Sequence, residues 1–184
     1  MVIVVVVGMP GSGKDVLLQS AIALGFGHVG MGDVVRTYAA RSGLDASDQS
    51  IGGFASSERQ KHGGAIWAER TLKNMPEGNV IIDGSRSLDE INFFRKRLGD
   101  GLKVIAVHAP QEMRFKRLQL RHRDDDPENF EAFARRDNRE MTWGIGKAIE
   151  SADIAIDNNG SLDEFKIQCM NILHSVLGGH GKSI

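Results

Sequence analysis

The sequence predicts an α/β fold in three layers (α/β/α), in which a five-stranded parallel sheet is covered by helices on both faces. The main observation is that short, nearly continuous apolar runs alternate with longer segments of helical periodicity, as expected of parallel strands buried on both faces. A second observation is a glycine-rich turn that follows the first apolar run directly and opens a helix. The predicted strands are residues 1–7, 28–31, 79–83, 102–107 and 153–157.

The first predicted strand leads into a segment with the spacing G-x-x-x-x-G-K. In a phosphate-binding loop of this pattern, glycines adopt positive φ angles so that successive N–H groups point at phosphate oxygens. Lys14 would reach the β- and γ-phosphates, and the partly positive end of the following helix would face the same anion. We therefore expect ATP to bind the segment Gly8, Met9, Pro10, Gly11, Ser12, Gly13, Lys14 and Asp15.

Asp15 stands where this loop usually carries the Ser or Thr hydroxyl that binds Mg²⁺. A carboxylate is itself a good ligand for Mg²⁺, but it adds a negative charge beside the phosphates. At an effective dielectric constant of ~20, two unit charges ~4 Å apart interact by ~4 kcal/mol, a repulsion that the metal would have to offset. Asp15 is therefore either a ligand of Mg²⁺ or an acid that favours the start of the helix.

Helices are expected between the first and third predicted strands. The helix after the loop ends at Gly25, and a second helix starts at Asp33 and carries Arg36 one turn along. Residues 42–57 are rich in Gly, Ser and Asp, so we expect a mobile connection there, followed by a helix over residues 65–75.

The third predicted strand ends in Asp83, at the edge where open α/β sheets place their ligands. We interpret Asp83 as the acid that holds Mg²⁺, directly or through water; the alternative is an acid that simply ends the strand. Arg86 follows at the same edge, where a guanidinium can bind a phosphate through two parallel hydrogen bonds. Ser87 and Glu90 then have the spacing of a capping box, which opens a helix that ends at Gly99.

A helix that starts near Pro110 runs into a basic segment that turns abruptly acidic. These charges form either a solvated helix face or a small lid that closes arginines over a transferring phosphoryl group. The residues are Arg114, Lys116, Arg117, Arg121, His122, Arg123, Asp124, Asp125 and Asp126, followed on the next helix by Arg135, Arg136 and Arg139. After the fifth predicted strand, Ser161 and Glu164 form a second capping box for a helix to Leu177.

The composition fits one domain, residues 1–177, with a disordered tail over residues 178–184. The 23 basic and 24 acidic residues nearly cancel, so no bulk charge favours nucleic acid or an anionic membrane as a partner. No apolar stretch approaches the ~18 residues of a membrane span, and the N-terminal run lacks the basic leader of a signal peptide. A single cysteine, Cys169, in an apolar helical stretch favours a cytoplasmic protein.

Together these segments resemble the adenylate kinase-like P-loop kinases, and most closely an archaeal group of adenylate kinase-related proteins. The resemblance covers nearly the whole chain and implies the fold of a P-loop NTPase. It also implies an acceptor-binding helical insert at about residues 33–75 and a small helical lid at about residues 114–139. The matching segments are residues 8–14, 31–36, 82–88, 106–108 and 144–153.

In adenylate kinases, a Gly-Asp-x-x-Arg segment and an Asp-Gly-x-x-Arg segment bind the phosphate of the accepting monophosphate. The resemblance therefore implies that Asp33, Arg36 and Arg86 hold the acceptor. The loop between Gly84 and Arg86 is one residue shorter than in that family. The glutamine that reads the AMP base has no counterpart, and Glu90 occupies roughly its place.

The family lid carries an Arg, paired Asp residues and a later Arg. The resemblance thus adds lid arginines to the catalytic set, which is Lys14, Asp83, Arg123, Arg135 and Arg136. Residues 152–161 are similar to a stretch of dephospho-coenzyme A kinases that lies near the adenine of ATP. This similarity implies nucleotide contacts by Asn158 and Asn159.

The sequence thus predicts an ATP- and Mg²⁺-dependent phosphotransferase, with Asp15 and Asp83 as metal ligands and a nucleoside monophosphate such as AMP as acceptor. One alternative is transfer to a ribose hydroxyl, as in dephospho-coenzyme A kinases, for which a carboxylate such as Asp33 would accept the proton. Another is a nucleotide-binding sensor with little turnover. The expected partners are small-molecule nucleotides, with no nucleic acid and no membrane, and the expected assembly is a monomer or homodimer.

Overall fold

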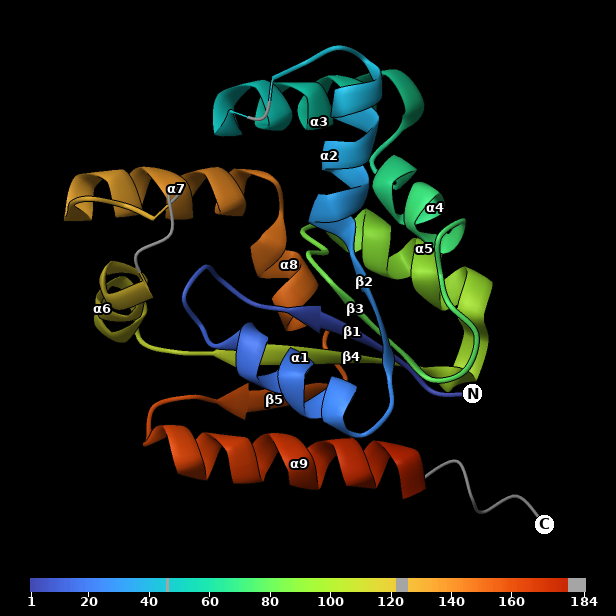
Figure 1. Cartoon of the computed structure of the whole chain (residues 1–184), viewed down its shortest axis with the longest axis vertical. Helices are drawn as coiled ribbons and strands as arrows, with labels where there is room; N and C mark the ends of the chain where they lie inside the picture. Colours follow the sequence, from blue (N-terminus) through green and yellow to red (C-terminus); the bar gives the residue numbers. More distant parts are fainter. Residues whose placement is uncertain (46, 122–125, 179–184) are drawn as a thin grey trace.

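The computed structural model describes residues 1–45, 47–121 and 126–178. Its centre is a five-stranded, all-parallel sheet in the order β2-β3-β1-β4-β5. Helices cover both faces, so the predicted three-layer architecture with five parallel strands is confirmed (Figure 1). The strands are β1 (Ile3–Val7), β2 (Gly27–Gly30), β3 (Val80–Asp83), β4 (Leu102–His108) and β5 (Ile154–Asp157).

Alternate residues of the central strand contribute to two separate cores. Val4 and Val6 belong to the core formed with α1 (Lys14–Ala23) and α9 (Leu162–Gly178). Val5 belongs to the core on the other face, which includes side chains of α4 (Ile66–Leu72), α5 (Leu88–Leu98) and α8 (Ile145–Glu150). No side chain of β1 is more than 1% exposed, which explains why this strand is apolar throughout.

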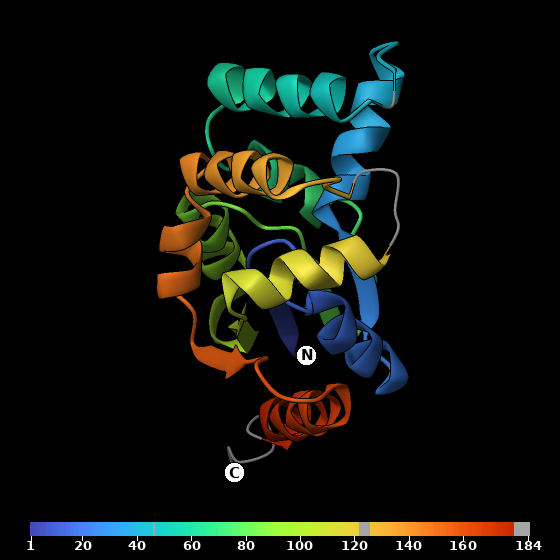
Figure 2. The same ribbon diagram turned by 90° about the vertical axis from the view of Figure 1, so that its left-hand side faces the viewer.

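The topology brings several loops to one edge of the sheet. The connection from β1 to β2 runs to one side and that from β4 to β5 to the other, so the order reverses between β1 and β4. Open α/β sheets bind ligands at such a switch point, outside the carboxyl ends of the strands. Val6 pairs with Asp83, so the loops after β1 and β3 leave the sheet side by side. Two helices, α6 (Gln111–Arg121) and α7 (Phe130–Thr142), lie beyond this edge (Figures 1 and 2).

The expectation of a mobile connection over residues 42–57 is wrong, because most of this segment belongs to α3 (Asp48–His62). The side chain of Ser47 caps its first turn. Trp67 of α4 is fully buried and donates its indole N–H to the carbonyl oxygen of Ala55 at 3.1 Å. Tertiary packing therefore overrides the low helix propensity of the Gly and Ser residues in this segment.

Other elements lie close to their expected positions. α2 (Met31–Arg41) begins slightly before Asp33, and α4 is shorter than the helix predicted over residues 65–75. A 3-10 turn, η1 (Gly99–Gly101), joins α5 to β4. Gly178 is the last residue of α9, and the rest of the predicted tail lies outside the described residues. None of the described helices has the length and apolar character of a membrane-spanning segment.

Candidate functional site

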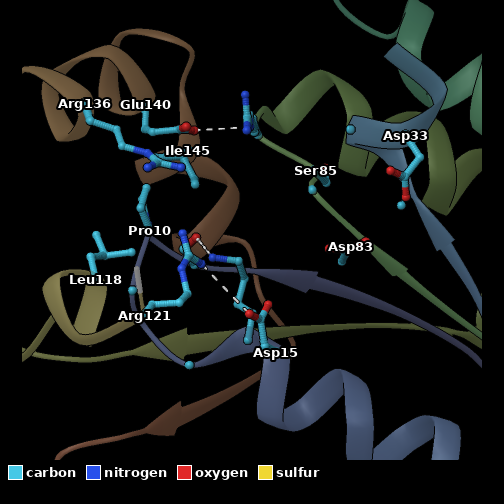
Figure 3. Close-up of a pocket in the computed structure, with 18 of the residues that line it drawn as sticks. Pro10, Asp15, Asp33, Asp83, Ser85, Leu118, Arg121, Arg136, Glu140 and Ile145 are labelled. Carbon is cyan, nitrogen blue, oxygen red and sulfur yellow. Dashed lines mark hydrogen bonds and ion pairs between the residues drawn. The ribbon is translucent and has the colours of Figure 1, made fainter. Parts of the chain in front are cut away.

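A cavity of about 350 Å³ opens at the carboxyl edge of the sheet, between the loop after β1, the start of α2, the loop after β3 and helices α6 and α7 (Figure 3). Six cationic and four acidic side chains line it, namely Lys14, Arg36, Arg86, Arg117, Arg121 and Arg136, and Asp15, Asp33, Asp83 and Glu140. Such a lining suits a polyanion that carries a divalent cation, because the cations attract the anion and the carboxylates attract the metal.

Close contacts explain the glycines of the loop after β1. Gly11 has a φ of 77°, and a Cβ there would lie 2.6 Å from the carbonyl oxygen of Arg114. Gly13 has a φ of 102°, and a Cβ there would collide with the side-chain amide of Asn158. Both positions therefore need glycine for conformation and for space. The Ser12 hydroxyl is buried and has no hydrogen-bond partner within the described ranges.

Lys14 turns back on its own loop. Its Nζ donates to the carbonyl oxygen of Gly8 at 2.6 Å and to that of Met9 at 3.0 Å. Burial lowers the pKa of Lys14 to about 8, while the negative charges of Glu140 and Asp15 act in the opposite direction. Phosphate oxygens can replace the two carbonyls as acceptors, so the glycine-rich loop and its lysine fit the triphosphate of ATP.

Asp15 faces a basic side chain across the cavity. Its Oδ2 lies 4.0 Å from Nη1 of Arg121, and the two side chains point toward one another in Figure 3. Arg121 also donates to Asp126 through Nε and Nη2. Asp15 lies in the first turn of α1, where a negative charge is favourable. The contact with Arg121 offsets part of the negative charge that Asp15 places beside the phosphate-binding loop.

Asp83 Oδ1 accepts a hydrogen bond of 2.9 Å from Nε2 of His28 on β2. Gly30 lies between Asp83 and Asp33, because a Cβ there would come 3.2 Å from Asp83 Oδ1 and 2.5 Å from Asp33 Oδ2. Across the described residues, no cluster of three His, Cys, Asp or Glu side chains could hold a metal alone. Mg²⁺ that arrives with ATP needs only one or two carboxylates, since phosphates and water complete its shell, and Asp15 and Asp83 are two carboxylates that line the cavity.

The two predicted acceptor arginines each contact a carboxylate. Arg36 Nη2 donates to Asp33 Oδ1 at 2.5 Å, one turn away on α2. Arg86 Nε lies 3.2 Å from Oε2 of Glu140 on α7. The Arg86 guanidinium also lies 4.9 Å from the ring centroid of Trp143. The Glu140 side chain is only 4% exposed, and Figure 3 shows its carboxylate directed into the cavity.

Helices α6 and α7, which carry most of the predicted lid, are anchored to the loop and to each other. The buried Arg114 guanidinium donates to the carbonyl oxygen of Pro10 at 3.0 Å and forms two hydrogen bonds with Asp137 of α7. Phe115 of α6 packs on Phe133 of α7, with ring centroids 5.3 Å apart. In this structure α6 is therefore held directly against the backbone of the phosphate-binding loop.

Most of the predicted site residues are brought together. Met9 contributes its carbonyl oxygen to Lys14 without lining the cavity, and Ser12 is buried. Arg123 lies outside the described residues. The predicted residues that line the cavity are Gly8, Pro10, Gly11, Gly13, Lys14, Asp15, Asp33, Arg36, Asp83, Arg86 and Arg136.

Besides Met9 and Ser12, three further predicted residues do not line the cavity. The Arg135 side chain is 71% exposed, because it lies about 100° around the helix from Arg136. Asn158 is buried and donates its amide to the carbonyl oxygen of Ser12 at 2.8 Å, so it supports the loop from behind. Asn159 lines a separate hollow beside β5 and α9.

Four titratable side chains that line the cavity are missing from the predicted catalytic and binding residues, namely His28, Arg117, Arg121 and Glu140, although Arg117 and Arg121 belong to the charged segment considered for the lid. Arg117 donates to Asn158 Oδ1 at 3.0 Å and lies four residues before Arg121, so both share one face of α6. Glu140 follows Arg136 at the same spacing on α7. Helical spacing from Arg136 could therefore have found Glu140, and the same spacing pairs Arg117 with Arg121, whereas nothing around His28 marks it in the sequence.

Comparisons with known sequences match nearly the whole chain. A family model described as an AAA domain matches residues 7–134. A UPF0200 protein of Thermoplasma acidophilum is 41% identical over 171 residues, which cover 92% of this chain and 94% of that protein. A UPF0200 protein of Methanosarcina barkeri is 37% identical over 180 residues, which cover 96% of this chain and 97% of that protein.

Solved structures share the fold at lower identity. TT1252 from Thermus thermophilus has a TM-score of 0.65 at 18% identity and covers 95% of this chain and 97% of its own. A gluconokinase from Sinorhizobium meliloti 1021 has a TM-score of 0.60 at 17% identity and covers 100% and 98%. Shikimate kinase from Aquifex aeolicus vf5 has a TM-score of 0.54 at 15% identity and covers 98% of each chain. The fold is thus that of a P-loop kinase-like, nucleotide-binding domain.

Proposed function

The chain belongs to the UPF0200 family and carries an AAA domain, and on that premise we propose that it is an adenylate kinase-like phosphotransferase. In the proposed reaction, the γ-phosphate of ATP moves to a nucleoside monophosphate such as AMP. It would act on small-molecule nucleotides in the cytoplasm, as a monomer or homodimer. The observation that carries the proposal is the single cavity in which the phosphate-binding loop and the two acceptor arginines, Arg36 and Arg86, lie together. Phosphoryl transfer requires this kind of electrostatic positioning and little covalent chemistry by the protein.

The donor side of the site follows from the loop. The triphosphate of ATP would occupy the glycine-rich loop, and Lys14 would exchange its two carbonyl partners for phosphate oxygens. Arg117, Arg121 and Arg136 line the same space from α6 and α7 and would stabilise the negative charge of the transferring group. Bound Mg²⁺ would neutralise charge between the phosphates, and Asp15 and Asp83 are the residues that would hold it.

The acceptor side follows from the paired arginines. Arg36 and Arg86 would bind the phosphate of the monophosphate, and each would exchange a carboxylate partner for it, Asp33 in one case and Glu140 in the other. A phosphate oxygen is already charged, so this transfer needs no general base.

Transfer to a hydroxyl is the second candidate function. The observation that favours it is the position of Asp33 and Asp83 on either side of Gly30, at the wall of the cavity, where a carboxylate could accept the proton of a hydroxyl. Two proteins that share the fold are by name a gluconokinase and a shikimate kinase. Asp33→Asn should nearly abolish transfer to a hydroxyl and should reduce transfer to a monophosphate much less.

ATP consumption and product mass test the proposal directly. The protein is offered ATP and Mg²⁺ with AMP, CMP, UMP, GMP, dephospho-coenzyme A or no acceptor, and Lys14→Ala serves as the control. We expect a phosphorylated monophosphate that is absent in the control. A phosphorylated dephospho-coenzyme A would favour the second candidate. Binding of ATP that depends on Lys14, without transfer to any acceptor, would contradict both and favour a nucleotide sensor.

A further inference from the structure

Glu90 is a fully buried carboxylate beside the acceptor arginine, and its side chain is 0% exposed. It accepts hydrogen bonds from the Arg86 backbone N–H at 2.7 Å, from the Ser85 hydroxyl at 3.3 Å and from Arg59 Nη2 at 2.9 Å. Ser85 and Arg86 both line the cavity, whereas Glu90 and Arg59 do not. One buried group therefore fixes the two residues that the loop after β3 presents to the acceptor.

Arg59 is the counter-ion of Glu90 and comes from α3. Its side chain is 18% exposed, and its Nε and Nη1 are buried with no hydrogen-bond partner in the described part of the chain. An unsatisfied buried donor costs about 1–3 kcal/mol, and a buried ion pair by itself adds little to stability. The pair does, however, fix the position of Arg86, because the Glu90 carboxylate that it orients also binds the Arg86 backbone N–H.

Both the backbone and the side chain of Arg86 are held in place. Its backbone N–H is bound by Glu90, and its guanidinium packs on Trp143 and contacts Glu140. The side chain remains 39% exposed and faces the cavity. Functional groups of this kind must be held within about 0.5 Å of the productive geometry, and a two-pronged contact with a phosphate is sensitive to such errors.

We propose that Glu90 and Arg59 are positioning residues for the acceptor, through which helix α3 fixes the place of Arg86. This inference rests on the proposed function, because it takes Arg86 as a ligand of the acceptor phosphate. The connection runs from Arg59 to the Glu90 carboxylate and from there to the Arg86 N–H. Glu90 occupies roughly the place of the glutamine that contacts the AMP base in adenylate kinases, but here its carboxylate binds the backbone N–H of Arg86.

Steady-state kinetics of Arg59→Met, Arg59→Lys and Glu90→Gln test the proposal. We expect kcat/KM for AMP to fall about 10- to 100-fold in Arg59→Met and Glu90→Gln, with KM for ATP within about twofold of the wild type, because a misplacement of about 1 Å can cost 10²-fold. Arg59→Lys, which keeps the charge, should recover part of the loss. The matched control is Arg70→Met. Arg70 lies on α4 and makes an ion pair of 2.6 Å with Glu58, which neighbours Arg59 on α3. Equal losses in Arg70→Met and Arg59→Met would overturn the inference.

Hydrogen exchange of the Arg86 amide gives a readout that does not depend on turnover. Its protection should fall at least about tenfold in Glu90→Gln and Arg59→Met and should be retained in Arg70→Met. If the wild type transfers phosphate to no acceptor, the proposed function fails, and binding of AMP in the presence of a non-hydrolysable ATP analogue then decides the inference. Weaker AMP binding in Glu90→Gln and Arg59→Met alone would support it. No AMP binding by the wild type, or unchanged protection of the amide, would overturn it.

Discussion

Asp137→Leu should destabilise the protein by about 3–5 kcal/mol, because it leaves the buried guanidinium of Arg114 without its counter-ion. Arg114 is 6% exposed and Asp137 is 7% exposed, so water cannot solvate the charge that remains. Two hydrogen bonds of 2.9 Å and 2.5 Å are lost together. For a chain of this length, about 2–4 °C per kcal/mol converts the loss into a decrease in Tm of about 6–20 °C.

Replacing both partners, Arg114→Met with Asp137→Leu, removes the charge and should return the free energy of unfolding to within about 1 kcal/mol of the wild type. Urea unfolding of the wild type, the two single variants and the double variant completes a double-mutant cycle. The reasoning would be refuted if Asp137→Leu cost less than about 1 kcal/mol, or if the losses of the single variants simply added in the double variant.

The double variant also separates stability from binding. Arg114 donates to the carbonyl oxygen of Pro10 at 3.0 Å, and the double variant lacks this contact even when its stability is restored. ATP affinity should therefore fall by about 3- to 10-fold, the equivalent of one net hydrogen bond. Equal ATP affinity in the wild type and the double variant would mean that Arg114 serves packing alone.

Three other substitutions or conditions give expected outcomes of their own. Gly52 and Gly53 lie inside α3 with open space at both Cβ positions, so changing both to Ala should raise the free energy of unfolding by about 1–2 kcal/mol in urea titrations; no gain would speak against a helix there. Glu140→Gln should tighten ATP binding about tenfold in calorimetry, because it removes a negative charge from the cavity, and weaker binding would contradict this. Burial lowers the pKa of Lys14 to about 8, so without ATP the Lys14 side chain loses its proton above that pH. A bound phosphate favours the charged form of the lysine. ATP affinity should consequently fall about tenfold from pH 7 to pH 9 with uptake of about one proton per ATP at pH 9, whereas Lys14→Arg should show a flat profile.

The sheet and the phosphate-binding loop could be predicted because their signals are local. Residues 3–7 show the continuous apolar run of a strand buried on both faces, and the loop requires glycine at positions with positive φ. α3 could not be predicted in this way, since it is held by Trp67 and by ion pairs with α4 and α5. Its helical conformation is a property of these distant contacts, and local propensity points elsewhere.

Two segments with the same Ser-x-x-Glu spacing show where local patterns stop being sufficient. At Ser161 the capping box is complete, because its N–H donates to Glu164 Oε2 at 2.8 Å and the Glu164 N–H donates to its hydroxyl at 3.3 Å. At Ser87 only the second kind of bond forms, from the Glu90 N–H at 3.3 Å. The carboxylate of Glu90 is diverted to Arg59, which lies 31 residues away in the sequence. Nothing in the four-residue pattern contains that information.

The sequence alone also does not show which of two neighbouring lid arginines faces the cavity. Helical periodicity places Arg135 and Arg136 on different faces of α7. Which face lines the cavity depends on how α7 packs on α6, where Asp137 accepts hydrogen bonds from Arg114. Similarly, the resemblance to dephospho-coenzyme A kinases implies that Asn158 contacts the nucleotide, whereas its amide supports the backbone of the loop. Motifs locate the site, whereas packing decides which of their side chains face it.

The hydrogen bonds of Lys14 determine what a ligand must offer to bind the loop. Its ammonium group already donates to the carbonyl oxygens of Gly8 and Met9, so an incoming anion replaces existing hydrogen bonds of the lysine. A single phosphate gives this lysine a stronger, charge-assisted partner, but the gain is reduced by the two hydrogen bonds to carbonyls that it replaces. A triphosphate also reaches successive N–H groups along the loop, which gain partners only when the ligand is long enough. The loop would therefore discriminate by the number of linked phosphates before any base is recognised.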